Sequence, residues 1–301
     1  MQLRWTAADI PDQAGRTALV TGANSGLGFQ TSLELARRGA RVLLGCRDPA
    51  RGASAVRRIH AEVPAAQVEL VDLDLSAQAS VQRAAQDVGA RVAVLDLLVA
   101  NAGVMAVPRA VTADGYELQL ATNHLGHFAL VARLAEALHA APSARVVVVS
   151  SEMHRIGRID FADLMGERSY GRWSAYGQSK LANLLFVREL QRRSAGSRLL
   201  AVAAHPGYAA TNLQTGQGNA VLQAALKAAT ALVAQPEAHG AWPQEYAATA
   251  PEVVGGGYYG PGAFGGLRGH PRPVTTARRA QDDAVARRLW DVSASLTGVG
   301  G

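Results

Sequence analysis

The chain has 301 residues, of which 49% are hydrophobic, so it can bury a substantial core. Its formal net charge is +6, but the arginines are scattered along the chain, which argues against nucleic acid as a partner. The single cysteine, Cys46, excludes an internal disulfide and a multi-cysteine metal site, and it fits a reducing cytosol. No secretion signal is visible, and the longest apolar stretch, 219–234, is too short to span a bilayer. We therefore expect a cytoplasmic protein with no metal and no integral membrane segment.

A glycine-rich loop follows the first predicted strand. That strand covers residues 17–21, the loop covers 22–28, and a helix is predicted at 29–38. A strand, a glycine loop and a helix in this order place backbone N–H groups against a phosphate. The glycine spacing is GxxxGxG, and an ordinary tight turn is the alternative interpretation. The residues expected to bind a cofactor here are Thr21, Gly22, Asn24, Ser25, Gly26, Leu27 and Gly28.

The second predicted strand, 41–45, ends where a dinucleotide fold meets the adenosine ribose. An acidic residue there would bind the 2′-hydroxyl of NAD(H), but Cys46 and Arg47 occupy the position. Arg47 favours the 2′-phosphate of NADP(H), provided that the neighbouring Asp48 faces solvent. We therefore expect a preference for NADP(H), with NAD(H) as the alternative cofactor and a plain surface role as the alternative for Arg47.

Strands and helices continue to alternate along the chain. Helices are predicted near 51–62, 79–88 and 114–140, and nearly continuous apolar strands at 68–71, 95–99, 145–149 and 199–204. Such strands are typical of a parallel sheet that is covered on both faces. The fold class is therefore α/β, a single doubly wound Rossmann-type domain over 1–301 with about seven parallel strands in the order 3-2-1-4-5-6-7.

The second half of the chain adds segments around this sheet. Residues 152–173 are predicted to be an irregular loop, and 207–250, with helices near 220–234 and 236–248, to cover the substrate. A short strand near 258–259 and a basic helical tail at 276–301 complete the chain.

Tyr176 and Lys180 stand four residues apart in a helical pattern, so they share one helix face. Only one other lysine, Lys227, occurs in the chain. A tyrosine hydroxyl titrates near 10, and an adjacent ammonium would lower that pKa and allow proton exchange near neutral pH. The alternative is a pair that merely shares a solvated face.

In this order the motifs resemble the short-chain dehydrogenase/reductase family, over roughly residues 15–265, and most of all its retinol dehydrogenase-like branch. The family motifs are Thr21-Gly22-x-x-x-Gly26-x-Gly28, Asp74-Leu75, Asn101-Ala102-Gly103, Asn123, Ser151, Tyr176-x-x-x-Lys180 and Pro206-Gly207 with Thr211. The branch motifs are Gly45-Cys46-Arg47-Asp48, Asn123-His124-Leu125-Gly126-His127-Phe128 and Ser179-Lys180-Leu181-Ala182-Asn183.

The sequence departs from the family pattern at two places. Ala100 replaces an asparagine before Asn101, which puts in doubt one structural hydrogen bond near the fourth strand. The gap between Ser151 and Tyr176 is longer than is common, in keeping with the retinol dehydrogenase branch, and bears on the substrate mouth or a subunit interface. We expect a homodimer or homotetramer.

The resemblance implies a role for each matching residue. Tyr176 would exchange the proton, Lys180 would bind the nicotinamide ribose and lower the pKa of Tyr176, Ser151 would bond the substrate oxygen, and Asn123 would hold a relay water. The cofactor's adenosine side would meet Asp74 with Leu75 and Asn101 with Ala102 and Gly103, and its nicotinamide would meet Pro206, Gly207 and Thr211.

These observations favour an NADP(H)-dependent oxidoreductase that interconverts an alcohol and a carbonyl. An apolar pocket walled by residues 152–173, Tyr208 and the 220–234 helix would take a lipophilic small molecule. The alternatives are a redox-sensing regulator without turnover and a C=C reductase on the same scaffold. A serine hydrolase is disfavoured because no Gly-x-Ser-x-Gly surrounds Ser151.

Overall fold

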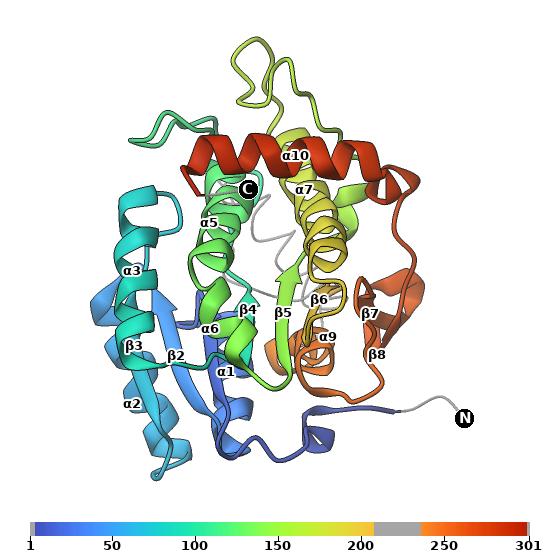
Figure 1. The fold of residues 1–301 in the computed structure, drawn as a ribbon. Coiled ribbons are helices and arrows are strands. Elements are labelled where there is room, and N and C mark those ends of the chain that lie inside the picture. The colour runs from blue at the N-terminus through green and yellow to red at the C-terminus, as the bar shows by residue number, and fades with distance from the viewer. Residues whose placement is uncertain (1–3, 208–235, 300–301) are drawn as a thin grey trace, which may run out of the picture.

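The computed structural model describes residues 4–207 and 236–299. They form one sheet of eight strands in the order β3-β2-β1-β4-β5-β6-β7-β8, with helices on both faces (Figure 1). This confirms the predicted doubly wound fold. The strands are β1 (Thr17–Thr21), β2 (Arg41–Cys46), β3 (Val68–Asp72), β4 (Leu97–Ala100), β5 (Ala144–Val149), β6 (Leu199–Ala204), β7 (Tyr258–Ala263) and β8 (Arg268–Pro273).

Two hydrophobic cores fill the space between the sheet and its helices, because successive strand residues face opposite sides. On β1, Leu19 belongs to one core, and Ala18 and Val20 belong to the other. The first core lies under α3 (Gln78–Arg91), α5 (Gly126–Arg133), α7 (Arg172–Arg193) and α10 (Asp283–Thr297). The second lies under α1 (Gly26–Arg37), α2 (Pro49–Glu62) and α9 (Glu237–Thr249). Short helical pieces are η1 (Ala7–Asp9), α4 (Leu118–Leu120), η2 (Ala121–Leu125), α6 (Ala135–Ala140), η3 (Glu152–Arg155), η4 (Phe264–Gly266) and η5 (Arg278–Gln281).

The sheet has one strand more than the seven parallel strands that the sequence predicts. β1 to β7 are parallel, whereas β8 runs antiparallel to β7. Its sequence contains Pro271 and Pro273 and no apolar alternation, so it carries little strand signal. Proline is tolerated here because β8 is the edge strand of the sheet.

The single helix expected at 114–140 is divided in the structure. The Glu117 carboxylate caps its start by accepting from Gln119 N (2.9 Å) and Leu120 N (2.7 Å). A π-helical turn, η2, then carries Asn123 before α5 begins at Gly126. A Cβ atom added at Gly126 would run into the Leu75 carbonyl oxygen, so this glycine permits close packing of the helix against the chain after β3.

The C-terminal tail forms η5 and then α10, within the helical tail predicted at 276–301. α10 lies across α5 and α7 (Figure 1). Its Trp290 packs edge-on against Phe128, with ring centroids 4.9 Å apart, and also contacts Phe186 at 5.8 Å. The predicted loop at 152–173 is irregular apart from η3 and the first residues of α7. Within the two described ranges, no helix combines the length and the apolar character needed to cross a membrane.

We predict that Gly126→Ala lowers the free energy of unfolding by about 1–3 kcal/mol, because the added methyl group overpacks the contact with Leu75. Gly89→Ala is the matched control. Gly89 also lies inside a helix, α3, but a Cβ there meets no atom within 4 Å. The control should gain up to about 1 kcal/mol from helix propensity. Denaturant unfolding measures both, and equal stability of the two variants would contradict the packing role.

Candidate active site

The glycine loop between β1 and α1 leaves room for a ligand phosphate. Gly22 and Gly26 have φ values of +66° and +58°, which glycine adopts without strain. A Cβ added at Gly28 would clash with the Gly22 carbonyl and lie 2.5 Å from Asn101 Nδ2. The helix N-cap, Ser25, makes no side-chain capping bond, so the first turn of α1 presents N–H groups suited to an anion. The loop therefore fits a dinucleotide phosphate.

Thr21 lies beneath this loop. Its Oγ1 accepts hydrogen bonds from Asn101 N and Ala102 N, both at 3.0 Å, and its carbonyl accepts one from Asn101 Nδ2 at 2.8 Å. The Thr21 side chain is fully buried. Thr21 therefore joins the glycine loop to the end of β4. Because its side chain is buried, it would serve the cofactor site by fixing the backbone of Asn101 and Ala102 and not by touching the cofactor itself.

The adenosine end of the site contains Cys46, Arg47 and Asp48. Cys46 is buried, and burial raises the pKa of its thiol to about 11, so it is a neutral thiol. Arg47 is exposed and forms no ion pair within the described part of the chain. The Asp48 carboxylate is also exposed and caps α2 by accepting from Arg51 N at 3.0 Å. The expectation that Asp48 faces solvent is confirmed.

Asp74 and Leu75 follow β3. Asp74 Oδ1 accepts from Ser76 N (2.9 Å) and Ser76 Oγ (2.6 Å), which fixes the carboxylate in a tight turn. Leu75 is buried, and its carbonyl oxygen lies against Gly126. The turn that contains Asp74 and Leu75 therefore packs against Gly126, directly after the π-turn that carries Asn123.

Lys180 is anchored at the carboxyl end of β5. Its Nζ donates to the Val149 carbonyl at 3.0 Å, and Asn183 Nδ2 donates to the same oxygen at 3.1 Å. Ser150 Oγ donates to the Lys180 carbonyl at 2.8 Å. These bonds fix α7 against the end of the strand that delivers Ser151. Ser150 and Asn183 were not predicted as site residues. Their sequence signals are that Ser150 precedes Ser151 and that Asn183 ends the branch motif that begins at Ser179.

Asn123 brings a third element to this point. Its Oδ1 accepts from Val104 N (2.8 Å), and its Nδ2 donates to Val104 O and Ser179 Oγ (both 2.9 Å). A Cβ added at Gly103 would lie 3.0 Å from Asn123 Oδ1 and 3.5 Å from Lys180 Nζ. The loop after β4, the π-turn and α7 therefore converge, as the predicted residue set requires.

Burial governs the titration of the Tyr176 and Lys180 pair. Tyr176 is 6% exposed, and burial raises the pKa of its phenol to about 12, against which a hydrogen bond with Ser151 acts. Burial lowers the pKa of the Lys180 ammonium to about 8. Lys180 Nζ lies 5.6 Å from the centroid of the Tyr176 ring and is directed to Val149. The expected lowering of the tyrosine pKa by this ammonium is therefore absent in this structure.

The chain after β6 enters the site through Pro206 and Gly207. Gly207 has a φ of +68°, and a Cβ there would lie 2.5 Å from the Leu267 carbonyl oxygen. Its N–H donates to His205 Nδ1 at 3.2 Å. Thr211, Tyr208 and the helix predicted at 220–234 lie outside the described residues.

Two buried histidines of the described residues make hydrogen bonds. His124 bonds Ser293 Oγ at 2.9 Å, and His154 bonds the Ser151 carbonyl at 2.7 Å, in line with the prediction that the histidines pack or hydrogen-bond.

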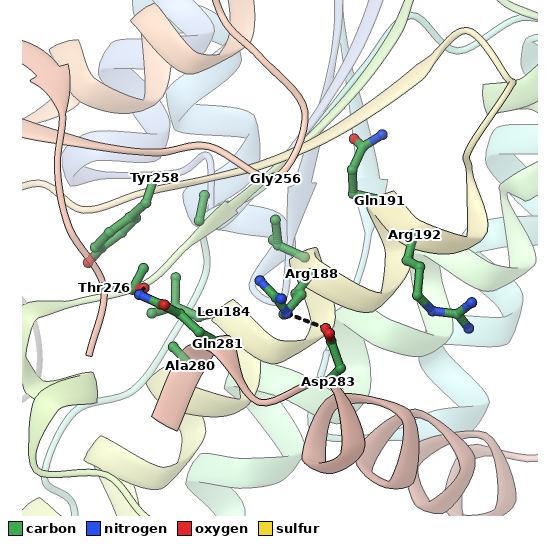
Figure 2. A pocket seen from close by; sticks show the side chains of 12 residues that line it. Leu184, Arg188, Gln191, Arg192, Gly256, Tyr258, Thr276, Ala280, Gln281 and Asp283 are labelled. Carbon is green, nitrogen blue, oxygen red and sulfur yellow. Dashed lines mark hydrogen bonds and ion pairs between the residues drawn. The ribbon is translucent and has the colours of Figure 1, made fainter. Parts of the chain in front are cut away.

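A cavity of about 400 Å³ lies between α7, β7 and the start of α10 (Figure 2). An Arg188–Asp283 ion pair of 2.5 Å stands at its side, and none of the predicted site residues lines it.

A glycine-lined phosphate cradle beside a half-buried serine and a buried tyrosine and lysine defines a dinucleotide-dependent oxidoreductase of the Rossmann type. The pattern of the short chain dehydrogenase family matches residues 16–221. The chain belongs to the short-chain dehydrogenase/reductase family, and its relatives place it in the retinol dehydrogenase-like branch. It is an enzyme of that family, and its cofactor class is NAD(P)(H).

Several curated relatives are similar over nearly the whole chain. Retinol dehydrogenase 14 of Mus musculus is 38% identical over 297 residues, covering 95% of this chain and 86% of the relative. Retinol dehydrogenase 13 of Homo sapiens is 40% identical, covering 97% and 86%. Polyprenol dehydrogenase of Mus musculus is 41% identical, covering 97% and 87%.

Solved structures agree with this assignment. A crystal structure of an uncharacterised protein from Mycobacterium paratuberculosis is 46% identical, covers 98% of both chains and has a TM-score of 0.82. A gluconate 5-dehydrogenase-like protein from Beutenbergia cavernae, solved with bound NADP, is 27% identical, covers 82% of this chain and 95% of its own and has a TM-score of 0.63.

We predict that the buried ammonium makes stability depend on pH. The pKa of Lys180 falls from 10.5 to about 8 on folding, so between these values the unfolded chain binds more protons and stability rises with pH. Below pH 8 the buried lysine is charged, so the full cost of burying this charge is subtracted from the free energy of unfolding. Relative to Lys180→Met, which lacks the charge, the wild type should gain about 2 kcal/mol between pH 7.5 and 10. Denaturant unfolding at each pH measures this difference, and parallel curves would contradict it.

Proposed function

We propose that the protein is an NADP(H)-dependent oxidoreductase that interconverts a lipophilic alcohol and its carbonyl compound, with Tyr176 as the general acid and base. The observation that carries this proposal is the meeting of Ser151, Tyr176 and Lys180 at the end of β5, beside Gly103 and the glycine loop. The retinol and polyprenol dehydrogenases among the relatives support alcohol and carbonyl chemistry over C=C reduction or a regulator without turnover.

The roles of the chain's own residues follow from their bonds. Ser151 Oγ accepts from Met153 N at 3.2 Å, and its hydroxyl proton would be donated to the Tyr176 oxygen or, with substrate bound, to the reacting oxygen. Tyr176, hydrogen-bonded to Ser151, exchanges a proton with the same oxygen. Lys180, whose Nζ is held by the Val149 carbonyl at 3.0 Å, would bind the nicotinamide ribose, the role that the family resemblance gives it. The bound nicotinamide would supply or accept the hydride. The glycine loop, Asn101 and Gly207 would hold the cofactor, and Asn123 would hold a relay water.

We predict that Tyr176→Phe lowers kcat at least a hundredfold, while the cofactor dissociation constant changes little. The reason is that the variant loses only the proton-transferring hydroxyl and keeps the ring's packing. Tyr116→Phe is the control, because its hydroxyl bonds the Leu296 carbonyl away from the site. Steady-state assays and cofactor titration make the measurement. Retention of a tenth of the wild-type rate by Tyr176→Phe would refute the acid and base assignment.

We propose NADP(H) as the preferred cofactor because the acid that would bond a 2′-hydroxyl is absent. The neutral Cys46 thiol is buried, the Asp48 carboxylate caps α2, and Arg47 is exposed without an ion pair among the described residues. An arginine beside a phosphate contributes about 1.5–3 kcal/mol, which is roughly a ten- to hundredfold preference.

We predict that Arg47→Ala weakens NADP(H) binding about tenfold or more and leaves NAD(H) binding nearly unchanged. Arg57→Ala is the matched control, because Arg57 is also an exposed arginine and lies further along α2. Dissociation constants for both cofactors measure the effect. Equal wild-type affinities, or equal losses for the two cofactors in Arg47→Ala, would overturn the assignment.

A lipophilic substrate is supported by an apolar side chain at the catalytic tyrosine. Trp173 is 50% exposed, and its ring centroid lies 6.4 Å from that of Tyr176. We predict that long apolar alcohols and aldehydes outperform short hydrophilic ones in kcat/KM, and that Trp173→Ala narrows the difference several-fold by removing apolar contact area. A panel in which sugars or short aldehydes are preferred would oppose this substrate class.

The state of assembly and the cellular location remain predictions. We propose a homodimer or homotetramer in the cytoplasm, with no nucleic acid partner. Any interface over α5 and α7 would have to include α10, because this helix lies across both (Figure 1).

A further inference from the structure

His127 is a buried histidine to which the proposed chemistry assigns no role. It lies on α5, one turn after Asn123, and is 1% exposed. Its Nδ1 is 3.0 Å from the Asn123 carbonyl oxygen, and its Nε2 is 2.9 Å from Thr21 Oγ1. One imidazole thus touches a predicted catalytic residue and the residue beneath the glycine loop.

The partners of the ring determine where its proton is. A carbonyl oxygen can only accept, so Nδ1 carries the hydrogen and donates to Asn123. Nε2 then has a lone pair, and the Thr21 hydroxyl donates to it. The Thr21 oxygen at the same time accepts from Asn101 N and Ala102 N, both at 3.0 Å. The hydrogen bonds therefore run in one direction, from the Thr21 hydroxyl to His127 Nε2 and from His127 Nδ1 to the Asn123 carbonyl.

The neutral ring is favoured by its surroundings. Burial lowers the pKa of His127 to about 4, and the nearby Lys180 ammonium acts in the same direction. A protonated ring would place a second N–H toward Thr21, whose oxygen already accepts two N–H groups. The arrangement is thus stable at the pH where the enzyme would work.

The chain of bonds joins elements that are far apart in the sequence. Thr21 ends β1 and leads into the glycine loop, while Asn101 and Ala102 follow β4. Asn123 lies in the π-turn, where Gly126 N bonds the Ala121 carbonyl. Asn123 Nδ2 uses both of its hydrogens on Val104 O and Ser179 Oγ, and Oδ1 accepts from Val104 N, so a relay water could bond this residue at the second lone pair of Oδ1 or at the main-chain carbonyl. His127 fixes the direction of that carbonyl.

We propose that His127 is a positioning residue that couples the cofactor loop to Asn123 through Thr21. It holds the Asn123 carbonyl and the loop backbone in one mutual orientation, so that cofactor binding and proton transfer depend on the same imidazole. This inference rests on the proposed function for the roles of the glycine loop and Asn123. The competing account is that His127 only fills the core.

The test compares His127→Gln, His127→Leu and Thr21→Val. The glutamine side chain ends in an NH2 donor and an oxygen acceptor on one carbon and can offer one group to each partner of the imidazole, whereas leucine fills the space without either. The readouts are the NADP(H) dissociation constant without substrate, kcat and the melting temperature. Cofactor binding does not require turnover, so this readout is independent of whether Tyr176→Phe sustains the proposed function.

We expect His127→Leu and Thr21→Val each to raise the NADP(H) dissociation constant about tenfold and to lower kcat about tenfold, with His127→Gln within about threefold of wild type. The double variant should bind no more than about threefold worse than either single variant, because both break one chain. Unchanged cofactor binding in His127→Leu would overturn the proposal. So would fully additive effects, or a His127→Gln variant as impaired as Thr21→Val. If His127→Leu does not fold, His127→Gln and Thr21→Val decide by the same criteria.

Discussion

The buried ammonium of Lys180 is the constraint on which the site depends. Taking a cation out of water is costly, and burial lowers its pKa to about 8. The cost is offset only where an acceptor is held at hydrogen-bond distance, which the Val149 carbonyl does at 3.0 Å. Because that carbonyl ends β5, α7 must be seated firmly on the strand. The bonds from Ser150 and Asn183 provide this seating, and they also place Tyr176 next to Ser151.

Close approach of backbone segments is the second requirement, and glycine makes it achievable. Gly157 and Gly177 are an example: a Cβ at Gly157 would run into the Gly177 carbonyl, so the chain after η3 can lie directly on α7. Gly126 does the same for the π-turn against Leu75. These contacts help to bring Ser151, Asn123 and the turn after β3 together near the carboxyl ends of the strands. The helical tail then covers the outer face, where Trp290 contacts both α5 and α7 side chains.

Hydrogen bonds between polar side chains and backbone connect the cofactor end with the catalytic end. Asn101 reaches Thr21, Asn123 reaches Val104 and Ser179, and His127 lies between them. In a low-dielectric interior such networks rigidify their members, because an unpaired buried group is costly.

The sequence by itself determined the local features of this protein. The alternation of apolar strands and helices, the glycine loop and the four-residue spacing of Tyr176 and Lys180 are periodic or short-range signals, and the structure and the relatives agree with the fold and family they indicate. Only the tertiary structure decided how these parts meet. The Val149 acceptor for Lys180 and the His127 contact with Thr21 join residues 31 and 106 positions apart. The proline-containing β8 and the π-turn likewise depend on pairing and packing with distant segments. Such contacts leave no periodic trace in the chain, because they are selected by the geometry of the folded backbone and not by local propensity.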